Sequence, residues 1–302
     1  MTESNVQAAT PPPLPPALTP EEAERLAREA GLNELGSVPP FRKYLKDLWA
    51  NRHLIWALSS SQAYSANQNN YLGQLWAILN PILLVGSYYF IFGFLIPTRG
   101  GTENYLAFLT IGIFVFGYTA SSLTSGSRAV TGSIGLVRAL QFPRALLPIS
   151  ATLTQFLTQL PAFAVLMIMM PLTGEPVSTK WLLFPLALVL QTMINLGFAF
   201  YLSRIVNASR DVANLVPVVV RLARYISGVF FSISHYAKGH YLLGFVLLYQ
   251  PLAAPITAVR ESLMAEYEPK LSTWVACAFW AVVLSASGLV FFWRGEGRYG
   301  AN

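Results

Sequence analysis

Six long hydrophobic segments, separated by short polar stretches, dominate the chain after residue 70. They run roughly over Leu75–Ile96, Tyr105–Thr124, Leu146–Leu172, Trp181–Leu202, Val212–Ile233 and Thr273–Trp293. Each is close to the roughly 20 residues that an α-helix needs to cross about 30 Å of hydrocarbon. The pattern therefore predicts an all-α polytopic membrane protein with six transmembrane helices over residues 71–294, so that both termini lie on the same side.

The segments before the first span have a different character. Between Phe41 and Leu58, apolar residues recur at helical spacing while charged residues occupy the other faces. We assign residues 41–70 to an amphipathic interface helix and a linker, with the helix lying either at the membrane–water boundary or on a partner protein. Residues 1–40 are rich in proline and predict a cytosolic tail, with one short helix that begins at the capping-box pair Thr19 and Glu22.

Composition narrows the class of protein. The chain is 54% hydrophobic and only 11% charged, whereas soluble domains carry about 25% charged residues. A soluble enzyme, a disordered protein and a disulfide-stabilised secreted module are therefore excluded, and the single cysteine agrees. We interpret the net charge of +6 as membrane topology and not as affinity for nucleic acid.

The distribution of Lys and Arg predicts the orientation. These residues are more numerous in the segments on the side of the termini than in the opposite loops. Because cytoplasmic loops carry an excess of Lys and Arg, both termini, including residues 295–302, are predicted to be cytoplasmic. The predicted location is the cytoplasmic (plasma) membrane, with the chain crossing it several times and contacting membrane lipids.

An unusual stretch separates the fifth and sixth hydrophobic segments. Tyr241–Tyr249 is apolar but too short to cross a membrane, prolines follow it, and a second short helix is predicted at about Ile256–Glu266. This pattern predicts an external re-entrant hairpin that gates a pathway, because non-helical backbone at membrane depth must be buried or line a cavity. An ordinary external loop with surface helices is the alternative. The candidate gate residues are Tyr241, Tyr249, Pro251, Pro255, Arg260 and Glu261.

Two arginines lie inside the fifth segment. Arg221 and Arg224 are three residues apart, hence on one helical face, and no Asp or Glu lies inside any of the six segments. Since an arginine near mid-bilayer costs roughly 2.5–3.5 kcal/mol on insertion scales, we expect the pair to face water or an anionic ligand such as a phosphate. Snorkelling, or bonding to carbonyls of a neighbouring helix, is the alternative.

Uncharged polar and aromatic residues extend this candidate pathway. The polar residues share helical faces in the third and fourth segments. Together with aromatic residues of the first and fifth segments they could form a wet pore with aromatic surfaces for sugar rings, although such polar residues often only bond helix to helix. The candidates are Tyr88, Phe92, Gln155, Gln159, Gln191, Asn195 and Tyr225. Gly117, Ser121 and Ser125 form a ridge of small residues, which predicts close helix packing.

The chain has no visible energy source. It contains no Gly-Lys dipeptide and hence no P-loop, and its three histidines are too dispersed to predict a metal site. The spans also lack the carboxylates of a proton relay. No cofactor is therefore predicted for this chain, and another component must supply the energy.

Several strings resemble one family. Leu54–Leu58 and Tyr71–Pro81 look like the beginning of the first span in ABC-2 type polysaccharide export permeases, which export O-antigen, teichoic acid and capsule. Weaker matches follow in the family's order, and the resemblance extends to about Phe292. These weaker matches are Phe142-Pro143-Arg144, Arg210-Asp211-Val212, Gln250-Pro251-Leu252 and Arg260-Glu261. The whole chain is most similar to actinobacterial permeases for lipid-linked galactan.

The resemblance implies a working complex. The implied complex is a homodimer of six-span ABC-2 permease domains with two copies of a separate ATPase subunit, and the ATPase subunit binds ATP and Mg²⁺. The complex would move a polyprenyl-diphosphate-linked polysaccharide, here galactan, from cytoplasm to exterior for cell-wall biogenesis. A coupling helix at Gly132–Leu140 would contact the ATPase through Ile134, Leu136, Val137 and Leu140.

The chain also departs from the family's pattern. The family usually carries basic residues between the positions of Leu58 and Tyr71, where this chain has none. If those residues bind the substrate's diphosphate, Arg221 and Arg224 or Arg52 become candidates here.

Two other functions stay open. One is an ABC-2 permease for a small lipid or drug. The other is a membrane-embedded enzyme acting on lipid-linked sugars, for which Glu261, Glu266 and Glu268 are the external carboxylates that could serve as acid and base.

Overall fold

Helices make up all the regular secondary structure in the described part of the chain. The computed structural model describes residues 39–66, 75–91, 102–139, 142–236 and 241–299, together with Thr19, Glu22, Arg25 and Leu26. Residues 1–37 and 38–302 form two separate units. In the first unit, Glu22 N donates to Thr19 Oγ1 at 3.4 Å and Thr19 N donates to Glu22 Oε2 at 3.1 Å, which confirms the predicted capping box.

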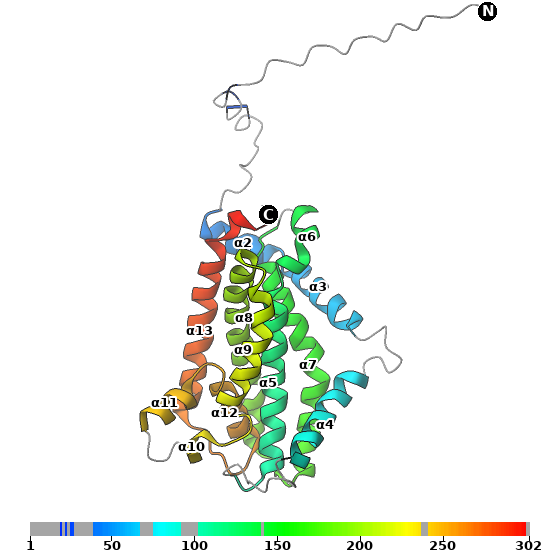
Figure 1. Cartoon of the computed structure of the whole chain (residues 1–302), viewed down its shortest axis with the longest axis vertical. Coiled ribbons are helices and arrows are strands. Elements are labelled where there is room, and N and C mark those ends of the chain that lie inside the picture. Colours follow the sequence, from blue (N-terminus) through cyan, green and yellow to red (C-terminus); the bar gives the residue numbers. More distant parts are fainter. Residues whose placement is uncertain are drawn as a thin grey trace, which may run out of the picture. The chain divides into compact units, whose positions relative to one another are not determined.

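The second unit is a helix bundle (Figure 1). Its helices are α2 Phe41–Ala50, α3 Arg52–Ser65, α4 Leu75–Tyr89, α5 Tyr105–Ser127, α6 Ile134–Ala139, α7 Leu146–Leu172, α8 Phe184–Ala208, α9 Val212–Ile226, α10 Ile233–Tyr236, α11 Tyr241–Tyr249, α12 Ala254–Leu263 and α13 Leu271–Trp293. Short 3₁₀ turns occur at η2 Thr131–Ser133, η3 Thr179–Leu183 and η4 Glu296–Arg298. We call the upper end of the bundle in Figure 1 the α2/α6 end and the lower end the hairpin end.

Among the described residues, four helices are long and apolar enough to cross a membrane. They are Tyr105–Ser127, Leu146–Leu172, Thr179–Ala208 and Leu271–Trp293, and the bent pair of α11 and α12 would make a fifth span if counted as one. The all-α, multi-span class is therefore confirmed. The exact number of six spans stays a prediction, and the described part of the first one is the 15-residue α4.

The predicted fifth span, Val212–Ile233, is wrong at its end. Helix α9 stops at Ile226, and Gly228 follows with a φ of +69°. That left-handed conformation suits glycine and ends helices. The apolar residues that follow Gly228, which extend the hydrophobic pattern, therefore belong to an irregular turn and not to the helix.

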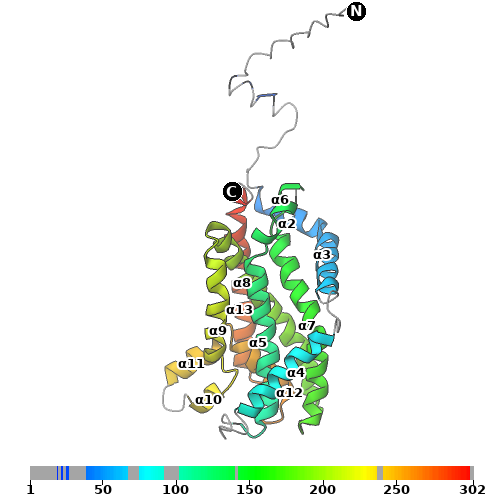
Figure 2. The same cartoon turned by 45° about the vertical axis from the view of Figure 1, so that its right-hand side comes forward.

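Helix α5 lies in the centre of the bundle, next to α7, α8 and α9 in both views (Figures 1 and 2). It is apolar around most of its circumference, as expected of a helix enclosed by others, and Phe108, Ile111 and Phe114 are fully buried. Helices α8 and α13 approach closely at Gly197, where an added Cβ would lie 2.5 Å from the backbone carbonyl carbon of Leu284.

The amphipathic segment forms two helices, α2 and α3, that meet at Asn51. Both pack on their own chain. Tyr44 of α2 is buried and its hydroxyl accepts a hydrogen bond from Ala145 N at 3.0 Å. Ser59 of α3 donates to the Ser150 carbonyl of α7 at 3.2 Å. The exposed Trp49 and Trp56 are left on the outer surface, as the membrane-boundary interpretation expects.

Candidate functional site

The predicted hairpin exists as two short helices with a sharp bend. Helices α11 and α12 meet at 79°, and Pro251 lies in the turn between them. Pro255 is buried in the first turn of α12, where a proline costs no helical hydrogen bond. Tyr249 ties the bend to α13, since its carbonyl accepts from Trp280 Nε1 at 2.7 Å and its hydroxyl donates to Ser272 Oγ at 2.9 Å.

These contacts confirm the hairpin's shape. Its role as a gate and its position outside the membrane stay predictions. Tyr241 begins α11, but its side chain lies outside the described residues.

Arg260 joins the hairpin to the centre of the bundle. Its guanidinium is buried, and its carbon lies 3.3 Å from the centre of the Phe108 ring on α5. Nη1 donates to the Gly228 carbonyl at 2.8 Å, and Nη2 donates to the Val229 and Phe108 carbonyls at 3.1 and 3.2 Å. One side chain of α12 therefore holds both the turn after α9 and the backbone of α5, through the fixed fork geometry of arginine. We call this arrangement the Arg260 clamp.

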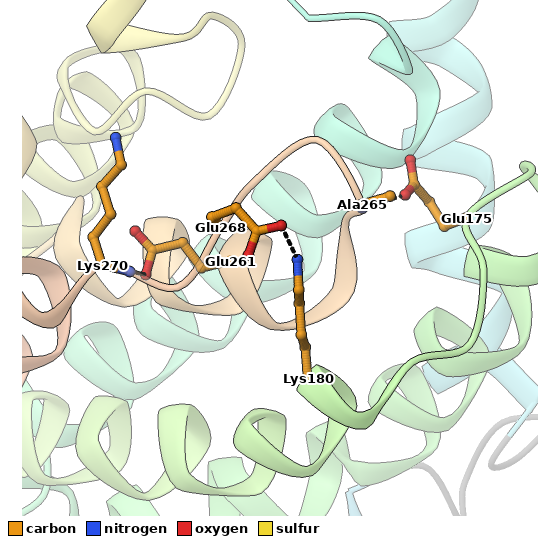
Figure 3. Close-up of polar contacts among 6 residues, drawn as sticks. All are labelled: Glu175, Lys180, Glu261, Ala265, Glu268 and Lys270. Carbon is orange, nitrogen blue, oxygen red and sulfur yellow. Dashed lines mark hydrogen bonds and ion pairs between the residues drawn. The ribbon is translucent and has the colours of Figure 1, made fainter.

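Two buried carboxylates secure the segment that follows α12 (Figure 3). Glu261 accepts from Thr273 Oγ1 at 2.7 Å and from Lys270 N at 3.1 Å. Glu175, after α7, accepts from Ala265 N at 2.7 Å and from Asn104 Nδ2 at 2.8 Å. Each therefore binds one backbone donor and one side-chain donor. The donors to Glu261 lie in the segment just after α12, whereas those to Glu175 come from segments distant in sequence.

The two other glutamates that the enzyme alternative would use also have structural contacts. Glu268 pairs with Lys180 Nζ at 2.6 Å, and Glu266 accepts from Glu103 N at 3.0 Å. Both side chains are exposed, whereas Glu261 is buried. An exposed carboxyl with one contact can still reach a substrate, so these contacts do not distinguish a transporter from an enzyme.

The candidate pathway arginines lie on α9. Arg221 is exposed, whereas Arg224 lies with its guanidinium carbon 5.4 Å from the centre of the Phe116 ring of α5. Tyr225 is exposed and its ring lies 5.4 Å from that of Phe230. Arg221 and Tyr225 therefore lie on the exposed surface of α9, whereas Arg224 is half-buried against α5.

The other predicted pathway residues do not share one surface. Gln191 is buried between α8 and α5 and donates to the Val115 carbonyl at 2.7 Å and to Thr119 Oγ1 at 2.9 Å. Asn195 is fully buried one turn further along α8, with no hydrogen-bond partner among the described residues. Gln155 and Gln159 are half-buried on α7. Gln191 thus makes the helix-to-helix bonds of the alternative interpretation, and the pathway role of this group stays a prediction.

Two members of the pathway group cannot be placed. Phe92 lies outside the described residues, as does the side chain of Tyr88.

The predicted coupling segment forms the short helix α6 at the α2/α6 end (Figure 1). Val137 is buried in a cluster with Tyr44 and Leu146, and Leu136 packs against that cluster. Ile134 is half-buried at the start of the helix, and Leu140 lies outside the described residues. Contact with an ATPase stays a prediction, and Val137 in particular contributes to the chain's own packing.

One prediction about α5 is wrong. Gly117, Ser121 and Ser125 were expected to pack against a neighbouring helix, but an added Cβ at Gly117 would meet no atom within 4 Å and Ser121 is exposed. Ser121 and Ser125 line a cleft of about 630 Å³ between α3, α5 and α7. Sequence reasoning missed this cleft, and the one available signal was a row of hydroxyl groups leading to Arg128.

Taken together, the long apolar helices and the bent helix pair define an all-helical, multi-pass membrane protein. No family model matches the chain. Among curated proteins, it is 26% identical to an O-antigen export system permease protein RfbA of Klebsiella pneumoniae over 198 residues, which cover 65% of this chain and 74% of that protein. It is 21% identical to the protein of the same name from Myxococcus xanthus over 242 residues, which cover 80% of this chain and 92% of that protein.

These homologues confirm, at modest identity, the resemblance to ABC-2 type polysaccharide export permeases. By name they are permeases of an export system, that is, transport proteins.

Proposed function

We propose that this chain is the membrane-spanning subunit of an ABC exporter that moves a polyprenyl-diphosphate-linked polysaccharide, galactan, from the cytoplasm to the exterior. The observation that carries the proposal is the similarity to O-antigen export permeases over as much as 80% of the chain. The bundle of long apolar helices supports it, because such helices fit a polytopic transporter.

The proposed working unit is a homodimer with two copies of an ATPase subunit. The sequence has no P-loop, so ATP and Mg²⁺ would bind to that partner. Helix α6 at the α2/α6 end supplies a short segment for contact with it, with both termini on the cytoplasmic side. This orientation agrees with the excess of Lys and Arg on that side.

The proposed pathway runs along the outer flank of α9. Arg221 is exposed there without an ion-pair partner among the described residues, and it shares its helix with the half-buried Arg224. A diphosphate offers acceptor geometry that matches the guanidinium fork. The hairpin of α11 and α12 would close this route on the external side.

An export assay tests the proposal directly. Cells depleted of this chain are complemented with the unmodified gene together with its ATPase subunit, and lipid-linked glycan is measured outside and inside by surface labelling. We expect export to depend on both chains and to stop when the ATP-binding lysine of the ATPase is substituted. Full activity of the purified chain without a second polypeptide and without ATP would overturn the proposal.

The same assay separates the alternative cargo. The length of the exported sugar chain distinguishes a polysaccharide exporter from a permease for small lipids or drugs. Arg221→Gln combined with Arg224→Gln is expected to reduce export at least tenfold. Unchanged export by this double variant would show that the two arginines are not part of the transport pathway.

A further inference from the structure

A cleft opens between α3, α5 and α7 and extends toward the segment between α5 and α6. Its volume of about 630 Å³ lies within the range of pockets that bind small molecules, roughly 300–1,000 Å³. Its lining is mixed, because apolar residues such as Ala120, Leu147 and Ala151 alternate with residues that carry hydroxyl, amide and guanidinium groups. These polar groups require an explanation, since the long helices of the bundle are otherwise strongly apolar.

The floor of the cleft is the open face of α5. Ser121, Thr124 and Ser125 line it, one to two turns along the helix from Gly117, beside which there is open space. The opposite walls contribute Gln62 of α3 and Ser150 of α7. The hydroxyls of Thr124 and Ser150 donate to carbonyls of their own helices, and the Gln62 side-chain oxygen accepts from Thr154. The hydroxyl oxygens of Thr124 and Ser150 can still accept a hydrogen bond, and the amide nitrogen of Gln62 can still donate one, as the hydroxyl groups of a sugar require.

A single cation lies among these groups. Arg128 follows the last turn of α5 and is exposed, and no carboxylate belongs to the lining. The structure describes one hydrogen bond for its guanidinium, from Nη2 to the Ala213 carbonyl of α9 at 3.3 Å. The remaining N–H groups of the fork are therefore available to an anion, and a phosphate accepts two parallel bonds from a guanidinium.

We propose that this cleft binds the head group of a lipid-linked sugar, with Arg128 on the phosphate and the hydroxyl-bearing residues on the first sugar. The inference rests on the proposed function and adds to it a binding site separate from Arg221 and Arg224. A cation without a carboxylate selects an anion, and the row of hydroxyl groups selects a sugar over a bare phosphate ester. The Arg128 guanidinium also donates to the Ala213 carbonyl in the first turn of α9. A bound phosphate would therefore compete with this carbonyl for the guanidinium and would affect its contact with α9.

Cysteine protection tests occupancy of the cleft. Ser125→Cys is made in a Cys277→Ala background, and the chain is reconstituted with its ATPase subunit in phosphatidylcholine nanodiscs. The rate of modification by a water-soluble thiol reagent is measured with three probes: a polyprenyl diphosphate carrying a short oligosaccharide, phosphatidylglycerol, and inorganic diphosphate. We expect the glycolipid to slow modification at least fivefold and the other two to have little effect. The matched control is Ser287→Cys on α13, which does not line the cleft and should show no protection.

Substitution of the arginine tests the phosphate contact. Arg128→Gln should raise the glycolipid concentration needed for half-protection about tenfold, which corresponds to roughly 1.4 kcal/mol. Arg128→Lys should recover part of the affinity, since it keeps the charge but not the fork. Arg294→Gln, an exposed cation after α13, is the control and should change nothing. Thermal unfolding of each variant shows whether a loss of protection is only a loss of structure.

The outcomes separate this inference from the proposed function. Intact export with no protection, or equal protection by phosphatidylglycerol, would overturn the head-group site alone. Protection without any glycan export would leave the site standing and overturn the proposed function. A disulfide between two Ser125→Cys chains that forms equally fast with and without glycolipid would show an interface between copies and would overturn the site.

Discussion

Two glycines near the middle of helix α5 differ in how their neighbours pack. Toward the hairpin end, Gly112 touches both Val229 and the guanidinium of Arg260, and an added Cβ would lie 2.8 and 2.9 Å from them. Five residues later, Gly117 has no neighbour within 4 Å of the same added atom. One helix therefore combines a closed contact that holds the hairpin with an open position one turn before Ser121, which lines the cleft. Further along α5, Gly126 is tightly packed again, since an added Cβ would lie 2.6 Å from the Cβ of Ala199 on α8. The open face of α5 is therefore a local feature between two closely packed positions.

Alanine at the two glycines gives the largest expected difference. At Gly112, the new methyl group collides with a backbone carbonyl and a buried guanidinium, so we expect a loss of stability of about 1–3 kcal/mol. Gly117→Ala is the matched control, with space for the methyl group and a gain of up to about 1 kcal/mol in helix propensity. Thermal unfolding in detergent measures both. Equal shifts would show that these two positions of α5 do not differ in packing.

Two arginines provide the next comparison. Arg260→Lys keeps the charge but removes the fork that serves three carbonyls, so we expect a loss of roughly 2 kcal/mol from acceptors left without donors. Arg128→Lys changes an exposed residue with one hydrogen bond and should lower stability by less than about 0.5 kcal/mol. The unfolding midpoints of the two variants check this ranking. Similar losses would mean that the Arg260 clamp does not depend on the fork.

Local patterns were sufficient to predict the elements of the fold. Apolar runs located α5, α7, α8 and α13, and the prolines at 251 and 255 located the bend between α11 and α12. The end of α9 was missed because hydrophobicity continues past Gly228, while the backbone turns there through a positive φ. Composition alone does not distinguish an apolar turn from the last turn of a helix.

The site was less predictable, because it depends on which residues meet in space. Arg260 was recognised as a hairpin residue, but its partners are backbone carbonyls of α5 and of the turn after α9, which carry no sequence signal. Ser121 and Ser125 have the spacing of a packing ridge, and only the arrangement of α3 and α7 shows that nothing covers them. The spacing of residues along a single helix does not predict a cleft whose walls come from three helices distant in sequence.

A buried carboxylate makes the α2/α6 end sensitive to pH. Glu296 accepts from Arg144 N at 2.9 Å, and burial raises its pKa above 4.5, although the contacts with Arg144 and Tyr44 oppose the rise. A raised pKa means that the folded state favours the protonated form of Glu296. Protonated Glu296 therefore contributes to the free energy of unfolding in full below pH 4.5, and this contribution is lost as the pH rises through the pKa of the folded state. Glu296→Gln imitates the protonated form at every pH. We therefore expect the variant to gain stability relative to the unmodified chain as the pH increases from 4.5.

The unfolding midpoints of the unmodified chain and of the Glu296→Gln variant, measured between pH 4 and 8, test this effect. Taking the difference between the two removes the contribution of titrating groups that both proteins share. A constant difference across the range would contradict the buried carboxylate as the cause. A stability gain of the Gln variant that grows with pH would show that the α2/α6 end, next to the cleft, contains a tightly packed region around Glu296. The open space at this end would then be limited to the cleft beside α5.

The surface ion pair at the hairpin end has the smallest expected effect. Lys180 and Glu268 are 2.6 Å apart, but the side chain of Glu268 is 75% exposed, and pairs of this kind contribute about 0–1 kcal/mol. Lys180→Ala should therefore lower the unfolding midpoint only slightly at low salt and not at all near 1 M salt, where screening removes the attraction. Glu175→Ala removes a buried carboxylate that accepts from both Ala265 N and Asn104 Nδ2, of which the latter keeps only the Thr173 carbonyl. This variant should cost more and should not depend on salt. If the two variants lost stability equally, the rigidity of the hairpin end would come from surface charges rather than from the buried contacts that distinguish it from the cleft.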